Sequence, residues 1–318
     1  MSLALPLALF VFLASAFFLV KSSEWVIKNS VELSKLLGIS TFAIGFILIS
    51  VSTSLPELSV AIFSSLKNVP SLSVGNVLGA NLTVLTLILG LCAIIGSKIV
   101  LKKKEFEGLI ELLFITSIVT VLIFFTSSLS IGHGLILFAL FAFLLHRLYK
   151  RGKIGKAVFD GAAKARGWKA GTKLLISIAV LLAAAHFLVE SAVSIAGELA
   201  IAPAVIGATA VALSTTLPEL TVELRAIKSK QYALAMGDLF GSAVTNITLV
   251  LGTLSILNPR EINTVALVTV VPFLFITIFA VWFLFSKKGK IDTREGMVLV
   301  GIYALYLLAE FGILPIFG

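Results

Sequence analysis

Long apolar segments separated by short polar stretches recur along the whole chain. Many are free of charge over about 18 residues or more, which is long enough to cross a bilayer as a helix. The apolar stretch 112–145 is too long for one helix, and turn-forming residues at 127–134 divide it. We therefore predict an all-α polytopic membrane protein with ten spans, at residues 3–22, 40–66, 70–96, 108–126, 129–147, 174–195, 201–226, 232–257, 262–285 and 296–316.

The composition agrees with this prediction and excludes an ordinary soluble domain. Hydrophobic residues make up 59% of the chain, charged residues make up 13%, and the mean hydropathy is +1.12. A net charge of +9 would suggest nucleic acid for a soluble protein, but here the basic residues lie between spans. We expect the lipid bilayer as the partner, with no nucleic acid and no obligate protein partner. Cys92, the only cysteine, is expected to be a buried, unreactive thiol.

The basic residues also predict the orientation of the chain. Of the 25 Lys and Arg residues, all but Lys67 and Arg260 follow spans one, three, five, seven and nine. Because basic loops remain in the cytoplasm, this bias places both termini outside. We predict a multi-pass protein of the cell (plasma) membrane. No basic residue precedes the first apolar segment, so we expect a span there and not a cleaved signal peptide.

An internal repeat divides the chain into two halves. Ile44-Gly45 recurs as Ile206-Gly207, and the same offset of 162 relates Gly90 to Gly252. We predict a first five-helix repeat at 1–150 with its repeated core at 44–90, a basic cytoplasmic connector at 151–173, and a second five-helix repeat at 174–318 with its core at 206–252. Because each half has an odd number of spans, the halves enter the membrane in opposite orientations. Inverted repeats of this kind bind substrate at the midplane and work by alternating access.

Each half contains a nearly identical stretch, SVSTSLPE at 50–57 and ALSTTLPE at 212–219. Proline has no N–H, so we predict helix breaks at Pro56 and Pro218, where the carbonyl four residues earlier cannot receive its usual hydrogen bond. In hydrocarbon such a carbonyl is tolerated where it lines a cavity. Together with nearby hydroxyls and the Glu57 and Glu219 carboxylates, it forms a set of hard oxygen ligands suited to Ca²⁺ or Na⁺.

Three carboxylates, Glu57, Glu219 and Asp238, lie deep inside predicted spans. An ionisable group at such depth is expensive and indicates a functional site. One divalent cation neutralises the two glutamates, and its departure leaves two like charges at close range. We therefore predict that Na⁺ or protons must replace it. Glu223, one turn past Glu219, has two interpretations: it faces the pathway, or it forms a surface ion pair with Arg225, and the nearby Arg225 favours the ion pair.

The spans that follow the two Pro-Glu stretches carry glycines and polar residues. The spacing of Gly75 with Gly79, and of Gly237 with Gly241, allows close helix packing. Three polar residues of the later span are spaced four apart, which places their side chains on one helical face. They are Asp238, Ser242 and Asn246, and the corresponding residues of the first half are Asn76, Ala80 and Val84, a much less polar face.

The duplicated S-T-[ST]-L-P-E-L stretch, each copy followed by a G-[ND]-x-x-G helix, resembles the repeats of the cation/Ca²⁺ exchanger superfamily. The similarity is greatest to archaeal and bacterial Na⁺/Ca²⁺ exchangers, and ten spans with an inverted repeat extend it over almost the whole chain. The resemblance implies a secondary active antiporter that exchanges Ca²⁺ for Na⁺ by alternating access. Such a protein is a transporter and not an enzyme, with Ca²⁺ and Na⁺ as transported ions and no organic cofactor.

The resemblance also implies roles for individual residues. The implied Ca²⁺ ligands are Glu57, Glu219, Thr53 and Thr215, with the threonines contributing backbone carbonyls. The implied Na⁺ ligands are Ser50, Ser54, Glu57, Ala212, Thr215, Thr216, Glu219 and Ser242. Accessory residues along the pathway are Asn246, Asp238, Asn76 and Asn81.

The chain departs from the family pattern at four positions. Ala80, Val84 and Asn246 stand where serine, asparagine and aspartate are usual, and Asp238 replaces an asparagine. The Na⁺ position of the first half therefore lacks a hydroxyl, whereas that of the second half is complete. A Ca²⁺/H⁺ antiporter on the same fold is accordingly the alternative. The sequence leaves the stoichiometry, the selectivity among divalent cations, the resting conformation and the oligomeric state open.

Two other classes of function fit less well. Gly237-Asp238 is similar to an intramembrane aspartyl protease site, but no second aspartate lies in a neighbouring span, and H-E-x-x-H and G-x-S-x-G are both absent. A cation channel would conduct without a counter-ion and would survive the loss of one glutamate. The sequence also lacks the phosphate-binding pattern G-x-x-x-x-G-K-[ST], so transport driven by ATP is not expected.

Overall fold

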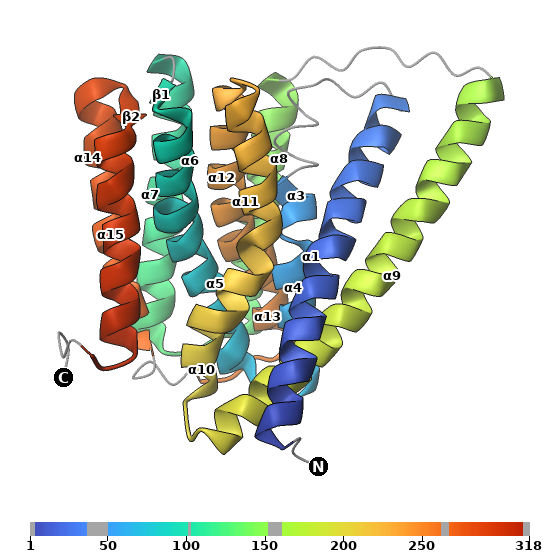
Figure 1. The fold of residues 1–318 in the computed structure, drawn as a ribbon, viewed down its shortest axis with the longest axis vertical. Coiled ribbons are helices and arrows are strands. Elements are labelled where there is room, and N and C mark those ends of the chain that lie inside the picture. Colours follow the sequence, from blue (N-terminus) through green and yellow to red (C-terminus); the bar gives the residue numbers. More distant parts are fainter. Residues whose placement is uncertain (1–3, 37–49, 101–102, 152–160, 262–266, 314–318) are drawn as a thin grey trace.

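The structure, a computed structural model, describes residues 4–36, 50–100, 103–151, 161–261 and 267–313. These residues are mostly helical, and the helices run along one long axis (Figure 1). In chain order the α-helices are α1 (Leu5–Leu36), α3 (Ser50–Thr53), α4 (Leu55–Leu66), α5 (Pro70–Thr83), α6 (Leu89–Gly96), α7 (Lys103–Thr126), α8 (Ile131–Arg151), α9 (Gly161–Glu198), α10 (Pro203–Ile206), α11 (Ala212–Lys228), α12 (Tyr232–Thr245), α13 (Leu251–Leu257), α14 (Val270–Lys288) and α15 (Thr293–Glu310). Both chain ends lie at the same end of the bundle (Figure 1).

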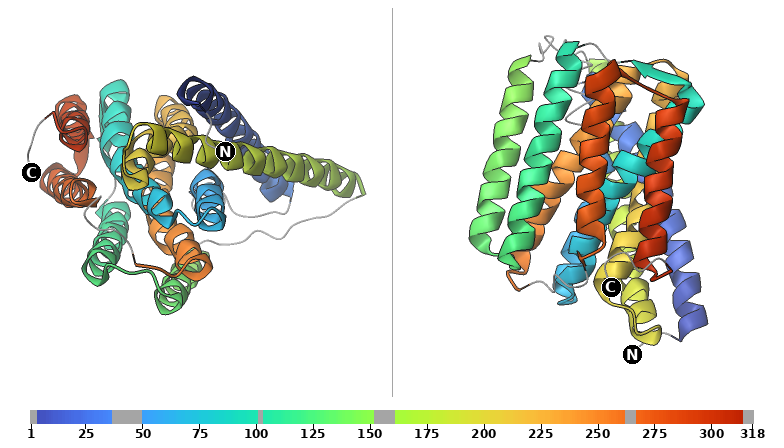
Figure 2. Two further views of the ribbon diagram at one scale, coloured as in Figure 1. Left: turned by 90° about the horizontal axis from the view of Figure 1, so that it is seen from below. Right: turned by 90° about the vertical axis from the view of Figure 1, so that its left-hand side faces the viewer.

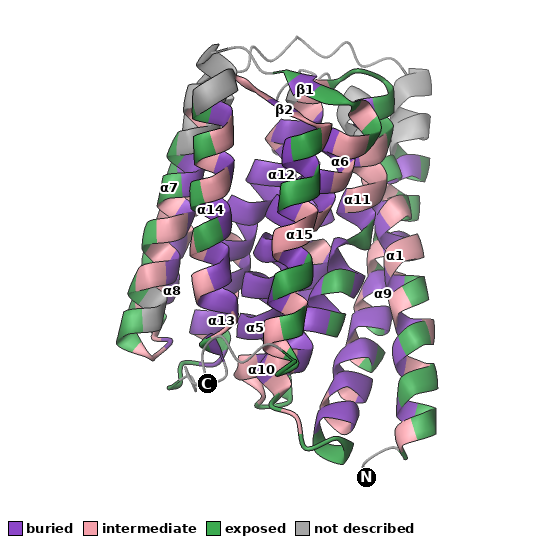
Figure 3. Ribbon diagram, turned by 60° about the vertical axis from the view of Figure 1, so that its left-hand side comes forward, coloured by how far each residue is buried: buried purple, intermediate pink, exposed green. Residues whose placement is uncertain are grey.

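Five helical segments are long and apolar enough to cross a membrane: Leu5–Asn29, Pro70–Gly96, Trp168–Glu198, Pro203–Lys228 and Leu234–Leu257. The outer faces of the bundle are apolar as well as exposed, with Phe125 80% and Phe10 70% accessible. The central helices α5, α12 and α13 are largely buried, and exposed residues gather on the outer helices (Figure 3). An apolar, exposed exterior around a buried centre is the surface of a multi-pass membrane protein.

Three π-helical segments interrupt the central helices: η2 (Val84–Ile88), η3 (Gly207–Val211) and η4 (Asn246–Val250). Adding 162 to the bounds of η2 gives those of η4, and adding 162 to the bounds of α5 gives those of α12. The offset seen in the sequence is therefore also an offset in local structure. Short π-helical segments of this kind occur frequently at functional sites.

The two Pro-Glu stretches differ in how they accommodate proline. In the first, α3 ends at Thr53 and α4 begins at Leu55, so Pro56 stands in the first turn, where its missing N–H is not needed. The predicted break at Pro218 is not present, because α11 continues through this residue to Lys228. The irregular backbone of the second half instead lies directly before the motif, in the π-helical segment η3.

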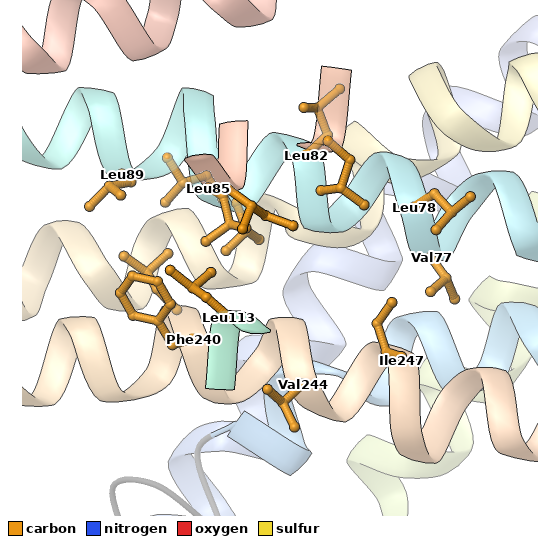
Figure 4. Packing of buried hydrophobic residues seen from close by; sticks show 14 of the residues in the cluster. Val77, Leu78, Leu82, Leu85, Leu89, Leu113, Phe240, Val244 and Ile247 are labelled. Atoms are coloured by element: carbon orange, nitrogen blue, oxygen red, sulfur yellow. The ribbon is translucent and has the colours of Figure 1, made fainter. Parts of the chain in front are cut away.

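Close packing of α5 against α10 and η3 confirms the role predicted for the first glycine pair. A Cβ atom on Gly75 or Gly79 would collide with the backbone carbonyl of Ala204 or Ala208. From the other side, a Cβ atom on Gly207 would collide with the carbonyl of Leu72. Apolar side chains continue this packing, with Leu85 and Leu89 near Phe240 in one part of the core and Val77 near Ile247 in another (Figure 4).

The helices α1 and α9 are longer than the predicted spans. They pack side by side at one edge of the bundle (Figure 2), and Asn29 Nδ2 donates to Ser177 Oγ at 3.0 Å. Residues 161–173, predicted as part of the connector, form the first turns of α9. Hydropathy falls at the charged residues, but the helix continues because Lys and Glu are good helix formers.

Short strand contacts link loops at both ends of the bundle. At one end, called here the inner end, β1 (Lys98–Val100) pairs antiparallel with β2 (Lys290–Asp292). An isolated antiparallel bridge joins Ser128 to Glu261, and Leu129 N–H donates to the Arg260 carbonyl at 2.8 Å. The inner end is opposite the end where the chain starts and finishes (Figure 1).

Candidate ion-binding site

The structure buries every residue predicted for the site. They come from α3, α4, α5, α11, α12 and η4. None of the thirteen non-proline residues is more than 1% exposed: Ser50, Thr53, Ser54, Glu57, Asn76, Asn81, Ala212, Thr215, Thr216, Glu219, Asp238, Ser242 and Asn246. Pro56 and Pro218 are buried too. The sequence therefore identified a set of polar residues that the fold gathers in its interior.

Threonine hydroxyls join each Pro-Glu stretch to a helix of the other half. Thr53 Oγ1 lies 2.9 Å from Ser242 Oγ and 3.4 Å from Asp238 Oδ1 on α12. In the second half, Thr215 Oγ1 donates to Asn76 Oδ1 on α5 at 3.1 Å. Adding 162 converts Thr53 to Thr215 and Asn76 to Asp238, so these are equivalent contacts made in opposite directions.

The carboxylates of Glu57 and Glu219 are neighbours, and no basic side chain pairs with either of them among the described residues. Both side chains are fully buried, and none of their four carboxylate oxygens has a hydrogen-bond partner. Glu57 lies near Glu219 and beside the Thr215 hydroxyl. The ion pairs of Lys21 with Glu24, and of Lys67 and His186 with Glu190, involve neither residue. Burying such a charge costs several kcal/mol unless a counter-charge is supplied.

Asn81 and Asn246 hold the two halves together beside these carboxylates. Asn81 Nδ2 donates to the carbonyl of Ala243 at 3.0 Å, and Asn246 Nδ2 donates to Asn81 Oδ1 at 3.2 Å. Ala243 is 162 positions after Asn81, so this residue contacts its own counterpart. Asn246 Oδ1 remains without a partner inside the protein.

Glu223 overturns one sequence-based interpretation. It was expected to form a surface ion pair with Arg225, but Glu223 is fully buried, whereas Arg225 is exposed. Its carboxyl group lies beside Asp238 and near Glu219. The burial of Glu223 agrees with the other interpretation, in which it faces the interior, because residues four apart on a helix share one face and Glu219 is buried too.

The positions that depart from the family pattern have different surroundings in the two halves. Ala80 and Val84 are fully buried and present only apolar side chains. Their counterparts Ser242 and Asn246 are buried too, and both make polar contacts. The flank of the site contributed by the first half therefore offers fewer side-chain oxygens than the flank contributed by the second half.

This arrangement suits a hard cation that binds reversibly. Among the described residues, no group of three or more His, Cys, Asp or Glu side chains forms a metal site. Two carboxylates, neighbouring hydroxyls and backbone carbonyls instead form an all-oxygen set, which Ca²⁺ and Na⁺ accept. Their unpartnered oxygens are the observation that fits a cation at this place.

Comparisons with known proteins agree with the geometry. Residues 7–150 and 171–312 match the family described as sodium/calcium exchanger protein. The sodium/calcium exchanger MaX1 of Methanosarcina acetivorans is 28% identical, covering 92% of this chain and 95% of the relative. An uncharacterized membrane protein of Methanocaldococcus jannaschii is 29% identical over 92% of this chain and 95% of its own length. A solved structure of the sodium-calcium exchanger NCX_Mj, soaked with Na⁺ and Sr²⁺, superposes with a TM-score of 0.70 at 27% identity, covering 96% of this chain and 99% of that one.

Proposed function

This chain belongs to the sodium/calcium exchanger protein family, and we propose that it is a secondary antiporter that exports Ca²⁺ against an inward flow of Na⁺. The observation that carries the proposal is the pair of fully buried carboxylates of Glu57 and Glu219, which come from the two copies of one motif. None of their four oxygens has a hydrogen-bond partner. The solved structures of NCX_Mj were soaked with Na⁺ and with Ca²⁺ or Sr²⁺. We assign the same two kinds of ion to this chain as transported substrates.

In the proposed mechanism, Ca²⁺ lies between the two glutamates, with backbone carbonyls of Thr53 and Thr215 completing its shell. One Ca²⁺ offsets both carboxylate charges, so an empty site leaves them repelling each other across a buried space. Na⁺ ions relieve this repulsion by binding to the carboxylates and to oxygens of the flanking residues. These flanking residues are Ser50, Ser54, Ala212, Thr216 and Ser242. The site then reorients only when an ion occupies it, which couples the two flows.

Alternating access follows from an inverted repeat of ten helices, and four features support that arrangement. The contacts of Thr53 and Thr215 are equivalent and reciprocal, and η2 and η4 share one offset. Asn81 contacts its own counterpart, which places it close to an axis relating the halves. The β1–β2 pair and the bridge between Ser128 and Glu261 link loops at the two ends of the bundle. Two such halves can open the central site to either side in turn.

The proposed topology places the inner end in the cytoplasm and both termini outside the cell membrane. It rests on the basic loops, which hold all Lys and Arg residues except Lys67 and Arg260. It agrees with the position of both chain ends at the end opposite β1 and β2 (Figure 1). The cell membrane is the proposed location because export there lowers cytoplasmic Ca²⁺.

A Ca²⁺/H⁺ antiporter is the second candidate, and the apolar flank of the first half favours it. Ala80 and Val84 supply no side-chain oxygen, which reduces the number of ligands for Na⁺. Protons need only the carboxylates themselves. The same alternating mechanism would then operate with protons as the returning charge.

Separate ion gradients applied to Ca²⁺-loaded proteoliposomes distinguish the two. We expect an inward Na⁺ gradient at equal pH to release Ca²⁺, and a pH gradient without Na⁺ to release none. Release that follows only the pH gradient rejects Na⁺ and establishes the second candidate. Release that needs neither gradient rejects both and indicates a channel. Liposomes without protein provide the leak control.

A further inference from the structure

Two buried carboxylates lie between the central site and the inner end of the bundle. Glu223 is one helical turn past Glu219 on α11, and Asp238 is on the adjacent helix α12. Both side chains are fully buried, and Glu223 Oε1, Glu223 Oε2 and Asp238 Oδ2 have no hydrogen-bond partner. The two carboxyl groups are neighbours, and ionised carboxylates have no proton to donate to each other. This pair is therefore an electrostatic feature that the central site does not explain.

Two hydroxyl groups, those of Thr53 and Ser242, lie near the Asp238 carboxylate. Thr53 Oγ1 lies 3.4 Å from Asp238 Oδ1, and the Ser242 hydroxyl is 2.9 Å from Thr53 Oγ1. Cys92 on α6 is a neighbour of Glu223 and supplies no positive charge. The ion pairs of Lys21 with Glu24, and of Lys67 and His186 with Glu190, lie elsewhere. Within the described part of the chain, the pair thus has oxygen neighbours and no basic one.

The equivalent place in the first half carries no charge. Subtracting 162 from Glu223 and Asp238 gives Ala61 and Asn76, and both are fully buried. Asn76 keeps the equivalent contact, because it accepts a hydrogen bond from Thr215 at 3.1 Å. The local geometry therefore forms without the two carboxylates, and they belong to the inner flank only.

We propose that Glu223 and Asp238, together with the hydroxyl oxygens of Thr53 and Ser242, form a second divalent-cation site on the inner flank of the central site. The proposal rests on the proposed function, since it takes Glu57 and Glu219 as the place where Ca²⁺ is exchanged. Two carboxylates offset the charge of one divalent cation, whereas one Na⁺ would leave a negative charge buried. Carboxylate and hydroxyl oxygens are ligands that Ca²⁺ takes, with water completing its shell.

The inner site holds an ion on its way to the central site. Glu219 and Glu223 are four residues apart on one helix, about 6 Å along its axis. Two divalent cations at that separation repel strongly in a buried space. The two sites therefore fill in turn, first Glu223 with Asp238 and then Glu57 with Glu219. Because the outer flank has Ala61 and Asn76 instead, Ca²⁺ binds more tightly from the inner side than from the outer side.

One test compares the Ca²⁺ affinity at the inner face of the membrane with the affinity at the outer face. In inside-out and right-side-out vesicles at one fixed pH, Glu223→Gln is expected to raise the half-saturating Ca²⁺ concentration at the inner face at least ~10-fold. The outer face is expected to keep its wild-type value. Glu198→Gln is the matched control, because it removes a carboxylate from the exposed end of α9. Equal shifts at both faces, or no shift, overturn the proposal.

Direct Ca²⁺ binding tests the site without transport. Purified full-length protein is titrated with Ca²⁺ in Na⁺-free detergent solution by calorimetry, and gel filtration verifies that each variant is folded. The double variant Glu57→Gln/Glu219→Gln is expected to bind one Ca²⁺ per chain. Adding Glu223→Gln and Asp238→Asn is expected to abolish this binding. A double variant that binds no Ca²⁺ overturns the site, and so does binding that survives all four changes. Neither outcome depends on whether the wild-type protein exchanges Ca²⁺ for Na⁺, so a failure of the proposed function is recognised separately.

Discussion

At the scale of single residues, the carboxylates in the centre of this protein lack the partners that buried charges normally have. Glu57, Glu219, Glu223 and Asp238 are all fully buried, and each has at least one oxygen without a hydrogen-bond partner. Removing one member of a buried ion pair is destabilising, because it leaves the other charge uncompensated. Here the neighbouring charges are alike, so removing one relieves repulsion. The effects of mutation on transport and on stability should therefore have opposite signs.

Glu57→Gln and Glu219→Gln test this directly. Each variant is expected to lower Ca²⁺ exchange by ~100-fold or more, since it removes a carboxylate from the proposed ion site. The Tm of the ion-free protein is expected to stay the same or to rise. Flux into proteoliposomes and thermal unfolding in detergent, with and without Ca²⁺, measure both effects. Exchange at the wild-type rate would refute the site. The Ca²⁺-dependent increase in Tm should become smaller in each variant, because the proposed inner pair of Glu223 and Asp238 still binds Ca²⁺.

Asn81 gives a prediction about stability, because its side chain bonds both halves. Asn81→Ala leaves Asn246 Nδ2 without its partner and removes one of the hydrogen bonds to the Ala243 carbonyl, which also accepts from the Asn246 backbone N–H. We expect a loss of about 2 kcal/mol in the free energy of unfolding, from one buried donor left unpaired and one hydrogen bond lost. Denaturant titration in detergent measures this loss.

Thr221→Ala is the control for Asn81→Ala. Its hydroxyl bonds only the Leu217 carbonyl of its own helix, at 3.1 Å and at an exposed position. This change is expected to cost about 0.5 kcal/mol or less. Equal losses in the two variants would mean that Asn81 has no special role between the halves.

At the scale of elements, the sequence predicted helix positions well where turn-forming residues bound them. The spans predicted at 70–96 and 232–257 have the same bounds as two continuous helical segments, Pro70–Gly96 and Tyr232–Leu257. The hydropathy pattern predicted α1 and α9 too short, because the apolar pattern ends at charged residues while the helix itself continues through them. The π-helical segments have no signature in composition, and Pro218 does not interrupt α11. The nearby Arg225 favours a surface position for Glu223, but the helical repeat places Glu223 on the buried face of Glu219.

The approach of α5 to α10 and η3 depends on glycine, and Gly79 tests it. Gly79→Ala places a methyl group against the Ala208 backbone, which cannot move aside as a flexible side chain would. We expect it to separate the two segments and to lower both the Tm and the exchange rate. Thermal unfolding and Ca²⁺ flux measure the two effects.

Gly301 provides the matched control for Gly79. It lies inside α15, and no heavy atom lies within 4 Å of the position that its Cβ would take. Gly301→Ala is expected to stabilise the protein by up to about 1 kcal/mol, through helix propensity alone. A stabilising effect at Gly79 as well would show that close approach is not required there.

At the scale of the whole molecule, the central helices are buried and the outer helices are more exposed (Figure 3). The carboxylates of Glu57, Glu219, Glu223 and Asp238 are all fully buried. Every proposed role on the inner flank depends on which end of the bundle faces the cytoplasm. The basic loops provide the argument for that orientation. The orientation can be measured independently of ion transport.

Cysteine labelling tests the topology, because Cys92 is fully buried and should give no background signal. Lys169→Cys places a thiol at an exposed position near the start of α9, and Glu198→Cys places one at its other end. In intact cells, a membrane-impermeant maleimide is expected to label only Glu198→Cys. Labelling of Lys169→Cys before the membrane is permeabilised would invert the proposed orientation.

The contact between Asn81 and Ala243, its own counterpart, bears on how such a protein can evolve. Two copies of one shorter chain, paired in opposite orientations, would present the same residues to both faces of a membrane. Any mutation would then alter both faces together. In a single fused chain each half mutates on its own, so acids can accumulate at Asp238 and Glu223 while Asn76 and Ala61 remain neutral. Gene fusion is thus the step that allows a symmetric carrier to acquire different Ca²⁺ affinities at its two faces.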